Sequence, residues 1–280
     1  MQIIPSLAEM RALVAALRRD HERIAFVPTM GNLHAGHLSL VHKARALADR
    51  VVVSIYVNPL QFGAGEDFAH YPRTLAEDCA LLETAGVDGV FTPTDAALYP
   101  EGKDNISHVV VPQLDSILEG AQRPGHFRGV ATIVNKLFNI VQPDLALFGE
   151  KDFQQLLLIR RMVEDLNLPV EILGLPTVRE ASGLAMSSRN AYLSAAEKAQ
   201  AAELFHTLRQ LREHYHAGDT DLARLSAEAC ARLREQGFLP EYVEIRRSHD
   251  LQRPQGGETD LVILAAARLG GTRLIDNLRI

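Results

Sequence analysis

Cysteine is scarce in this 280-residue chain, which contains only Cys79 and Cys230. The two lie far apart in the sequence, and neither belongs to a metal-binding or redox spacing. Nothing in their placement therefore indicates a metal or redox centre. This usage is typical of a reducing compartment, and we expect the protein to be cytoplasmic.

Long apolar runs are also missing. No stretch approaches the roughly 18 apolar residues that a membrane-spanning helix needs. The N-terminal segment contains Pro5 and Glu9 where a signal peptide would need an uninterrupted apolar region. We therefore expect a soluble protein that is not exported.

An excess of positive charge is lacking as well, because 29 Lys and Arg residues face 35 Asp and Glu residues, for a net charge of -6. The chain as a whole offers no electrostatic attraction to nucleic acid, so any binding of anions must be local. Repeats and low-complexity tracts are absent. The hydrophobic content of 47% is that of an ordinary globular protein with one large core or two modest domains.

The first part of the chain alternates short apolar runs with amphipathic stretches. Continuous β-branched runs such as VVVSIYV are typical of parallel strands that helices cover on both faces. We predict strands at 24–27, 51–57, 87–93, 144–149 and 170–176, and helices at 36–49, 73–85, 130–141 and 153–166. This order favours an α/β fold, a Rossmann-like doubly wound parallel sheet that binds ligands at the carboxyl ends of its strands.

The pattern changes near residue 176, where two Ala- and Leu-rich helical segments follow, at 195–214 and 221–236. Three apolar strands come next, and the last two flank Gly270 and Gly271, which is a hairpin signal. The turn-rich stretch 248–258 is expected to be an exposed loop. We therefore expect two domains, a Rossmann-like domain at 1–176 and a smaller C-terminal α+β domain at 177–280.

The stretch PTMGNLHAGH, residues 28–37, lies between a predicted strand and a predicted helix. Backbone N–H groups at a helix start have no intrahelical acceptor and favour anions, and Gly31 and Gly36 allow close backbone approach. His34 and His37 would face the same anion from one side of the first turn. Two alternatives remain, a zinc site, for which no accompanying ligand cluster is found, and two ordinary surface histidines.

Two further stretches carry donors or cations that suit phosphate. GEKD, residues 149–152, follows a predicted strand and places a lysine at the same edge of the sheet, although a solvated charged turn would read the same way. MSSRN, residues 186–190, offers N–H and O–H donors and a guanidinium fork, although a helix cap or turn is equally compatible with it.

Neutral amides form a third group, in NPLQFG at 58–63 and FQQ at 153–155. Such amides can bind a substrate that carries hydroxyl and carboxylate groups without supplying a fixed charge, and the alternative is that they are ordinary surface glutamines.

The H-x-G-H and M-S-S-R elements together resemble the nucleotidyltransferase superfamily. The ordered set PTMGNLHAGH, VNPLQFG, YPRT, RPGHFRGV, FGEKDFQQ and MSSRN is similar to the pantothenate synthetase (pantoate–β-alanine ligase) family over essentially the whole chain. Tyr56 stands where that family more often has phenylalanine. The resemblance implies ATP-dependent joining of pantoate to β-alanine through a pantoyl adenylate, with release of AMP and pyrophosphate. It also implies Mg²⁺ accompanying ATP, a homodimer, and a second domain that acts as a lid.

The resemblance further assigns residues to roles. It implies four catalytic residues, His34, His37, Lys151 and Arg189. Of these, His37 is carried over as the proton donor. For ATP it implies Met30, Gly31, Asn32, Leu33, His34, Ala35, Gly36, His37, Gly149, Glu150, Lys151, Asp152, Val178, Met186, Ser187, Ser188 and Arg189. For pantoate and β-alanine it implies Gln61 and Gln155, with Asn58, Arg123 and His126 as further candidates. Asp78 or Glu77 is a candidate magnesium ligand, or else part of a solvated helix face. No dedicated base for β-alanine is evident.

Three other functions compete with the ligase. A fragment of a class I aminoacyl-tRNA synthetase would share two of the motifs, but the negative net charge and the glutamine motifs argue against it. A nucleotidylyltransferase would stop after transferring AMP to its acceptor. A non-enzymatic ATP-binding module would bind ATP without regard to pantoate.

Overall fold

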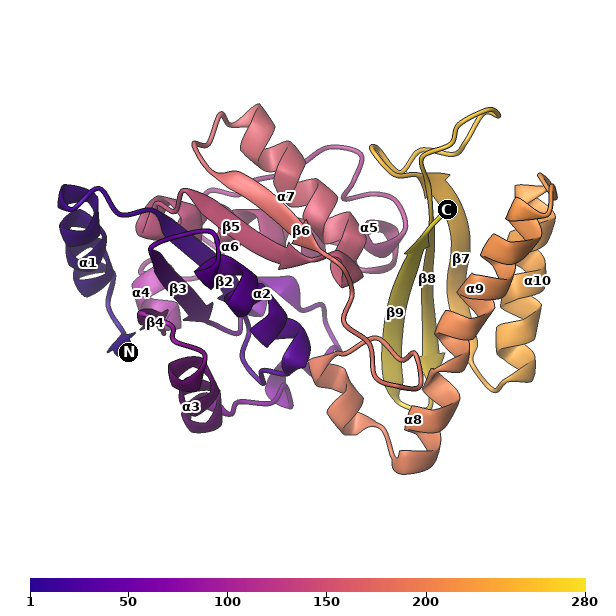
Figure 1. Cartoon of the computed structure of the whole chain (residues 1–280), viewed down its shortest axis with the longest axis horizontal. Helices are drawn as coiled ribbons and strands as arrows, with labels where there is room; N and C mark the ends of the chain where they lie inside the picture. The colour runs from indigo at the N-terminus through magenta and orange to yellow at the C-terminus, as the bar shows by residue number, and fades with distance from the viewer. The chain divides into compact units, whose positions relative to one another are not determined.

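The computed structural model describes residues 1–280 and divides into two compact units (Figure 1). The first unit comprises residues 1–150 and 155–176, and the second comprises residues 151–154 and 177–280. The second boundary between the units falls at 176/177. The short segment 151–154, however, which contains Lys151, clusters with the second unit.

A six-stranded parallel sheet with the order β1-β4-β3-β2-β5-β6 forms the centre of the first unit. Its strands are β1 (Gln2–Ile4), β2 (Ile24–Thr29), β3 (Arg50–Ile55), β4 (Gly89–Phe91), β5 (Leu145–Gly149) and β6 (Glu171–Leu175). The inner strands are buried along almost their whole length, as the continuous apolar runs predicted. The prediction of a doubly wound α/β fold with a smaller second sheet is confirmed.

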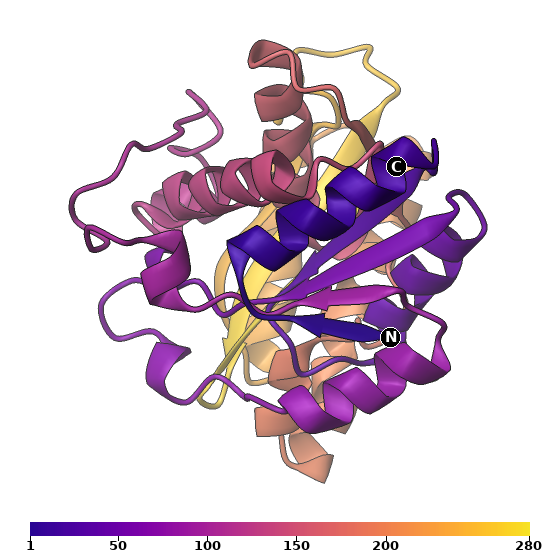
Figure 2. The same ribbon diagram turned by 90° about the vertical axis from the view of Figure 1, so that its left-hand side faces the viewer.

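Helices cover both faces of this sheet (Figure 2). The helices of this unit are α1 (Leu7–Arg19), α2 (Ala35–Arg45), α3 (Leu75–Thr84), α4 (Asp95–Leu98), α5 (Glu119–Gln122), α6 (His126–Val141) and α7 (Phe153–Asp165). On one face, Val41 of α2 and Leu82 of α3 join Val27 in a buried cluster. On the other face, Phe138 of α6 makes edge-on ring contacts with Phe26 and Phe148.

The strand order reverses beside β2. The chain adds β3 and β4 on one side of β2 and then returns to add β5 and β6 on its other side. The loops that follow β2 and β5 therefore leave from neighbouring strand ends, which is where ligands bind in open α/β sheets. The segments after β2, β3 and β5 carry the histidine, glutamine and GEKD motifs.

The second unit contains a three-stranded antiparallel sheet with the order β7-β8-β9. Its elements are α8 (Ala195–Ala201), α9 (Glu203–His216), α10 (Leu222–Glu235), β7 (Leu239–Arg247), β8 (Leu261–Leu269) and β9 (Thr272–Arg279), preceded by the 3₁₀ helix η4 (Ser188–Tyr192). Leu208 of α9 and Leu233 of α10 pack with Ile263 of β8 in a separate apolar core. The predicted hairpin is confirmed, with Gly270 at a φ of 55° in its turn.

Several predicted boundaries differ from the structure. The first strand and helix, β1 and α1, were not predicted, and β1 has only three residues, which pair with β4 far along the chain. The single helix predicted at 195–214 is divided at Ala202, where no glycine or proline marks the break. The helix predicted from residue 130 already begins at His126, after Gly125 in the left-handed conformation. None of the helices combines the length and apolar character needed to cross a membrane.

Candidate active site

The turn after β2 is held by its own side chains and by α3. Gly31 and Asn32 have φ values of 80° and 50°, in the left-handed region that favours glycine. Thr29 Oγ1 accepts the Gly31 N–H at 3.2 Å and donates to the Ser54 carbonyl at 2.8 Å. A Cβ on Gly31 would lie 3.0 Å from Asp78 Oδ2, so the turn fits closely against that carboxylate.

Asp78 holds this turn through two backbone groups. Its Oδ1 accepts the Leu33 N–H at 2.8 Å. Its Oδ2 accepts the Asn32 N–H at 2.9 Å and the Thr74 hydroxyl at 3.2 Å. The carboxylate is 2% exposed. Because both oxygens already accept hydrogen bonds, the structure favours an anchoring role for Asp78 over the magnesium role and over a solvated helix face.

The neighbouring Glu77 is exposed, as expected for the solvated face of α3. No group of three or more His, Cys, Asp or Glu side chains that could hold a metal ion occurs among residues 1–280. The residues present therefore do not form a protein cage for Mg²⁺, and we derive no step of the reaction through a protein-held metal.

His34 and His37 are brought together at the start of α2, with ring centroids 4.1 Å apart. His34 is the N-cap residue, and its Nδ1 accepts the Gly36 N–H at 3.1 Å. The backbone N–H of His34 in turn donates to His37 Nδ1 at 3.3 Å, which completes a capping box built from two histidines. A neutral imidazole with an accepting Nδ1 carries its proton on Nε2, so these contacts assign the Nε2–H tautomer to both rings.

Gln61 is the last residue of the 3₁₀ helix η1 (Pro59–Gln61), which lies in the segment after β3. Its Oε1 accepts a hydrogen bond from Asn58 Nδ2 at 3.0 Å. Asn58 is completely buried and therefore supports Gln61 from within the protein. Gln155, the other predicted pantoate ligand, lies half-buried in the first turn of α7.

The carbonyl of Gln61 is clamped from the other direction. His126 Nδ1 lies 2.7 Å from this oxygen, and Arg123 Nη2 donates to it at 3.2 Å. Arg123 Nη1 lies 3.0 Å from His126 Nε2, so Nε2 accepts, and His126 donates through Nδ1. Burial, with the nearby Arg123 charge, lowers the pKa of His126 to about 4, which keeps the ring neutral.

Glu66 completes this cluster by pairing with Arg123 at 2.6 Å. Burial alone would raise the pKa of Glu66, but the hydrogen bonds and charge of Arg123 bring it below its ordinary value. Arg123 and His126 thus contact the backbone of η1. We expected both as direct ligands of the substrate, whereas these contacts give them a supporting role.

In the second unit, the predicted ATP residues form two local arrangements. The Met186 N–H donates to the Val178 carbonyl at 2.9 Å, which ties the start of the MSSR loop to Val178. Ser187 Oγ accepts the Arg189 N–H at 3.3 Å and caps η4, so the helix-cap interpretation holds for this serine. Asn277 Nδ2 donates to the Lys151 carbonyl at 2.8 Å, and Lys151 Nζ lies 3.5 Å from Asp152.

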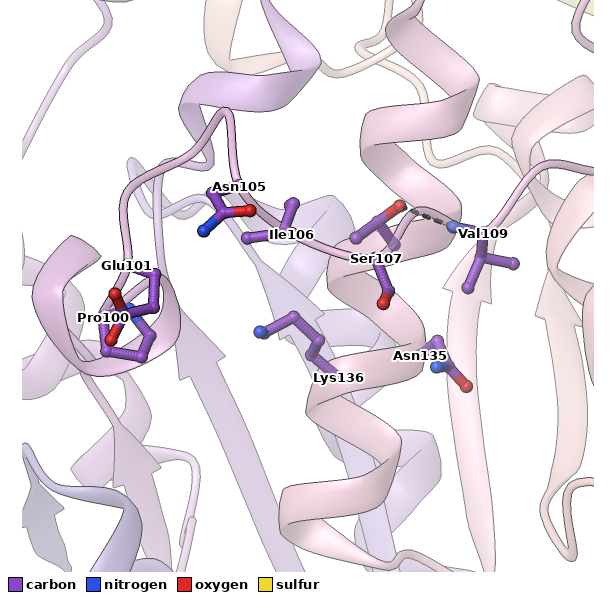
Figure 3. A pocket seen from close by; sticks show the side chains of 9 residues that line it. Pro100, Glu101, Asn105, Ile106, Ser107, Val109, Asn135 and Lys136 are labelled. Atoms are coloured by element: carbon purple, nitrogen blue, oxygen red, sulfur yellow. Dashed lines mark hydrogen bonds between the residues drawn. The ribbon is translucent and has the colours of Figure 1, made fainter.

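A cavity of about 340 Å³ lies elsewhere in the first unit, between α6 and the loop that follows α4 (Figure 3). It is lined by Pro100, Glu101, Asn105, Ile106, Ser107, Val109, Thr132, Asn135 and Lys136, none of which is a predicted site residue. Lys136 projects from α6 into this space, and its Nζ lies 5.1 Å from the centroid of the Tyr99 ring.

Sequence reasoning missed three supporting residues: Asp78 in its anchoring role, Glu66, and Tyr99, whose hydroxyl contacts Asn58 at 2.8 Å. Their partners lie 41 to 57 residues away in the chain. No local pattern marks such contacts, because they depend on which loops the sheet brings together.

Comparison with known proteins gives consistent results over the whole chain. The family model described as pantoate-beta-alanine ligase matches residues 2–279. Two proteins called pantothenate synthetase, from Shewanella loihica and Pseudomonas aeruginosa, are each 56% identical to this chain. The alignments cover 99% and 100% of this chain and 98% and 99% of those relatives, respectively.

Solved structures agree with the sequence relatives. The pantothenate synthetase of Thermus thermophilus is 47% identical and superposes with a TM-score of 0.91, covering 99% of both chains. The pantoate-beta-alanine ligase of Francisella tularensis, solved in complex with beta-gamma ATP and beta-alanine, is 35% identical with a TM-score of 0.84. It covers 100% of this chain and 97% of its own. This protein therefore belongs to the pantoate–β-alanine ligase family.

Proposed function

We propose that this protein condenses pantoate with β-alanine at the expense of ATP, producing pantothenate, AMP and pyrophosphate. The observation that carries this proposal is the full-length match, at 56% identity, to relatives called pantothenate synthetase. The local geometry supports it, because donors suited to phosphate and an amide suited to a hydroxy acid follow neighbouring strands, β2 and β3.

In the first half-reaction, the pantoate carboxylate attacks the α-phosphorus of ATP, and pyrophosphate leaves. Negative charge grows on the phosphoryl oxygens, so preorganised donors and cations are what the step requires. We assign the Nε2–H groups of His34 and His37 to this task, with Lys151 and Arg189 supplying positive charge.

The tautomer of His37 favours hydrogen-bond donation over complete proton transfer. In a cationic imidazole, Nδ1 carries a proton and can no longer accept the His34 N–H that donates to it in this structure. Two hydrogen-bond donors would then face each other. The capping box therefore favours the neutral ring, whose Nε2–H can share its proton with the departing pyrophosphate without releasing it.

In the second half-reaction, the neutral amine of β-alanine attacks the acyl carbon of pantoyl adenylate. The new C–N bond forms as the bond between the acyl carbon and the phosphate oxygen breaks, and AMP leaves. The amine proton passes to the AMP phosphate or to solvent. Proximity is then the main contribution of the protein.

For pantoate, we assign Gln61 and Gln155 as direct ligands of its hydroxyls and carboxylate, with Asn58, Arg123 and His126 holding Gln61. We propose that Mg²⁺ arrives bound to the ATP phosphates, as it commonly does in nucleotide sites, and we assign no protein ligand to it. The second unit as a lid and a homodimeric assembly remain proposals that rest on the family resemblance.

Isotope exchange tests the two-step mechanism. With ATP and pantoate but no β-alanine, the enzyme should exchange labelled pyrophosphate into ATP. If exchange is absent from enzyme that makes pantothenate, the adenylate mechanism is wrong. A simple nucleotidylyltransferase would show exchange but form no pantothenate when β-alanine is added, and a mere ATP-binding module would show neither.

A further inference from the structure

The orientation of the Gln61 amide determines what it offers to a substrate. A primary amide has an accepting oxygen at one end and a donating NH₂ group of nearly the same shape at the other. Oε1 of Gln61 is already used by Asn58 Nδ2, and no protein group accepts a hydrogen bond from Nε2. Gln61 therefore presents two N–H donors to its surroundings.

Asn58 fixes that orientation because its own amide has defined partners on both sides. Nδ2 donates to the Gly129 carbonyl at 3.2 Å as well as to Gln61, while Oδ1 accepts the Leu60 N–H at 3.4 Å. Backbone groups cannot exchange the roles of donor and acceptor, so these contacts favour one orientation of Asn58. Both contacts are long, however, and together they hold the amide loosely.

The short contact to Asn58 comes from Tyr99, whose hydroxyl donates to Oδ1 at 2.8 Å. Tyr99 is 3% exposed, and Lys136, which lines the cavity shown in Figure 3, lies over its ring. Burial raises the pKa of Tyr99, so its hydroxyl keeps its proton and remains a donor. Tyr56, the residue that departs from the usual family pattern, lies beside it and donates to Asp95 at 2.8 Å.

We propose that Tyr99 is a positioning residue for pantoate, acting through Asn58 to keep the Nε2–H donors of Gln61 facing the substrate hydroxyls. This inference rests on the proposed assignment of Gln61 to pantoate. In this proposal, Tyr99 acts on the substrate through two hydrogen bonds in series, from Tyr99 to Asn58 and from Asn58 to Gln61.

Replacement of Tyr99 by phenylalanine removes the hydroxyl and keeps the ring. We expect the KM for pantoate to rise by about 3- to 10-fold, on the scale of one buried neutral hydrogen bond, while the KM for ATP stays unchanged. The matched control is Thr132→Val on α6, which also removes one buried hydroxyl, one that accepts the Val109 N–H at 3.0 Å and makes no hydrogen bond to Tyr99, Asn58 or Gln61. The control should leave both KM values unchanged.

A double-mutant cycle separates this inference from the assignment on which it rests. If Gln61 binds pantoate, Gln61→Ala alone should raise the KM for pantoate; if it does not, the assignment fails. If Tyr99 acts through Gln61, adding Tyr99→Phe to Gln61→Ala should change that KM by less than about 1.5-fold. An undiminished effect of Tyr99→Phe in that background would overturn the positioning role and leave the Gln61 assignment standing.

Asn58→Asp provides a second route if Tyr99→Phe does not fold. The aspartate keeps an oxygen for Tyr99 and Leu60 but replaces the donor that faces Gln61 Oε1 with an acceptor, so the Gln61 amide should turn round. We expect the KM for pantoate to rise by about 10-fold or more, the scale of a lost or reversed buried hydrogen bond. A normal KM for pantoate in folded Asn58→Asp enzyme would contradict the proposal.

Discussion

His37 and Lys151 illustrate how single residues would serve adenylation by different means. The ring of His37 is held by a backbone N–H and offers one directed donor, whereas the Lys151 ammonium supplies charge that is less directional. Both residues were proposed from sequence motifs. The tautomer of His37 was not, because it depends on hydrogen-bond distances within the turn.

We expect His37→Ala and Lys151→Ala each to lower pantoate-dependent pyrophosphate exchange by about 100-fold or more, the scale of losing one preorganised donor. Exchange rates at saturating ATP and pantoate provide the measurement. His42→Ala, at an exposed position later in α2, is the control and should exchange normally. Near-normal exchange in folded His37→Ala enzyme would remove His37 from the mechanism.

Asp78 provides a second test at this scale. Asp78→Ala leaves the Asn32 and Leu33 N–H groups without their acceptor, so we expect a loss of exchange activity of about 10-fold or more, on the scale of two charge-assisted hydrogen bonds. The Mg²⁺ concentration that gives half-maximal rate should stay unchanged. The exposed neighbour Glu77→Ala should match the unaltered enzyme in both measurements. A selective rise in the Mg²⁺ requirement of Asp78→Ala would restore the metal-ligand interpretation.

Among the elements, α6 and η1 approach each other closely at Gly129. An added Cβ at Gly129 would lie 2.1 Å from the Leu60 carbonyl oxygen, far inside van der Waals contact, so the helix can approach the turn only because residue 129 is glycine. The same turn presents Gln61, and the carbonyl of Gly129 accepts from Asn58. The packing of one helix thus determines the position of the Gln61 side chain, for which we propose a role in binding pantoate.

Gly129→Ala should therefore lower stability by about 1–3 kcal/mol, as overpacking usually does, and should also raise the KM for pantoate. Denaturant unfolding and steady-state kinetics measure the two effects. Gly63→Ala is a control in the same loop, because its added methyl would lie no closer than 3.7 Å to the Glu66 side chain, which is ordinary van der Waals contact. Unchanged stability of Gly129→Ala would show that α6 and η1 can separate without cost.

At the level of elements, prediction from sequence succeeded where the signal was long and periodic. The buried strands β2, β3 and β5 appeared as continuous β-branched or apolar runs, and the hairpin of β8 and β9 carried a Gly-Gly turn. Strand β1 was missed because three residues carry no period, and its partner is β4, far along the chain. The break between α8 and α9 was missed because Ala202 is a good helix former.

The molecule as a whole depends on pH partly through His126, whose pKa is near 4 in the folded protein against 6.5 ordinarily. Between these values the unfolded chain binds a proton that the folded protein does not, so stability falls as the pH is lowered through this window. The loss of stability due to this residue is complete once the pH lies below 4, and it amounts to about 3 kcal/mol.

Denaturant unfolding at several pH values between 4.5 and 7 should show this dependence. The slope of the unfolding free energy against pH reports how many more protons the unfolded chain binds than the folded protein, and His126→Gln should reduce that number by up to one. The variant should also be less stable at neutral pH, because its hydrogen bonds are altered. His216→Gln, at an exposed position, should keep the slope of the unaltered protein. An unchanged slope in His126→Gln would mean that the ring titrates as an ordinary histidine.

The close approach at Gly129 also bears on the evolution of drug resistance. Every other amino acid carries a Cβ, so every missense change of this codon places an atom against the Leu60 carbonyl. An inhibitor that accepts hydrogen bonds from Gln61 Nε2 would rest on a backbone that such mutations cannot move without cost to the enzyme. Escape through residue 129 would therefore carry the same loss of stability that we expect for Gly129→Ala.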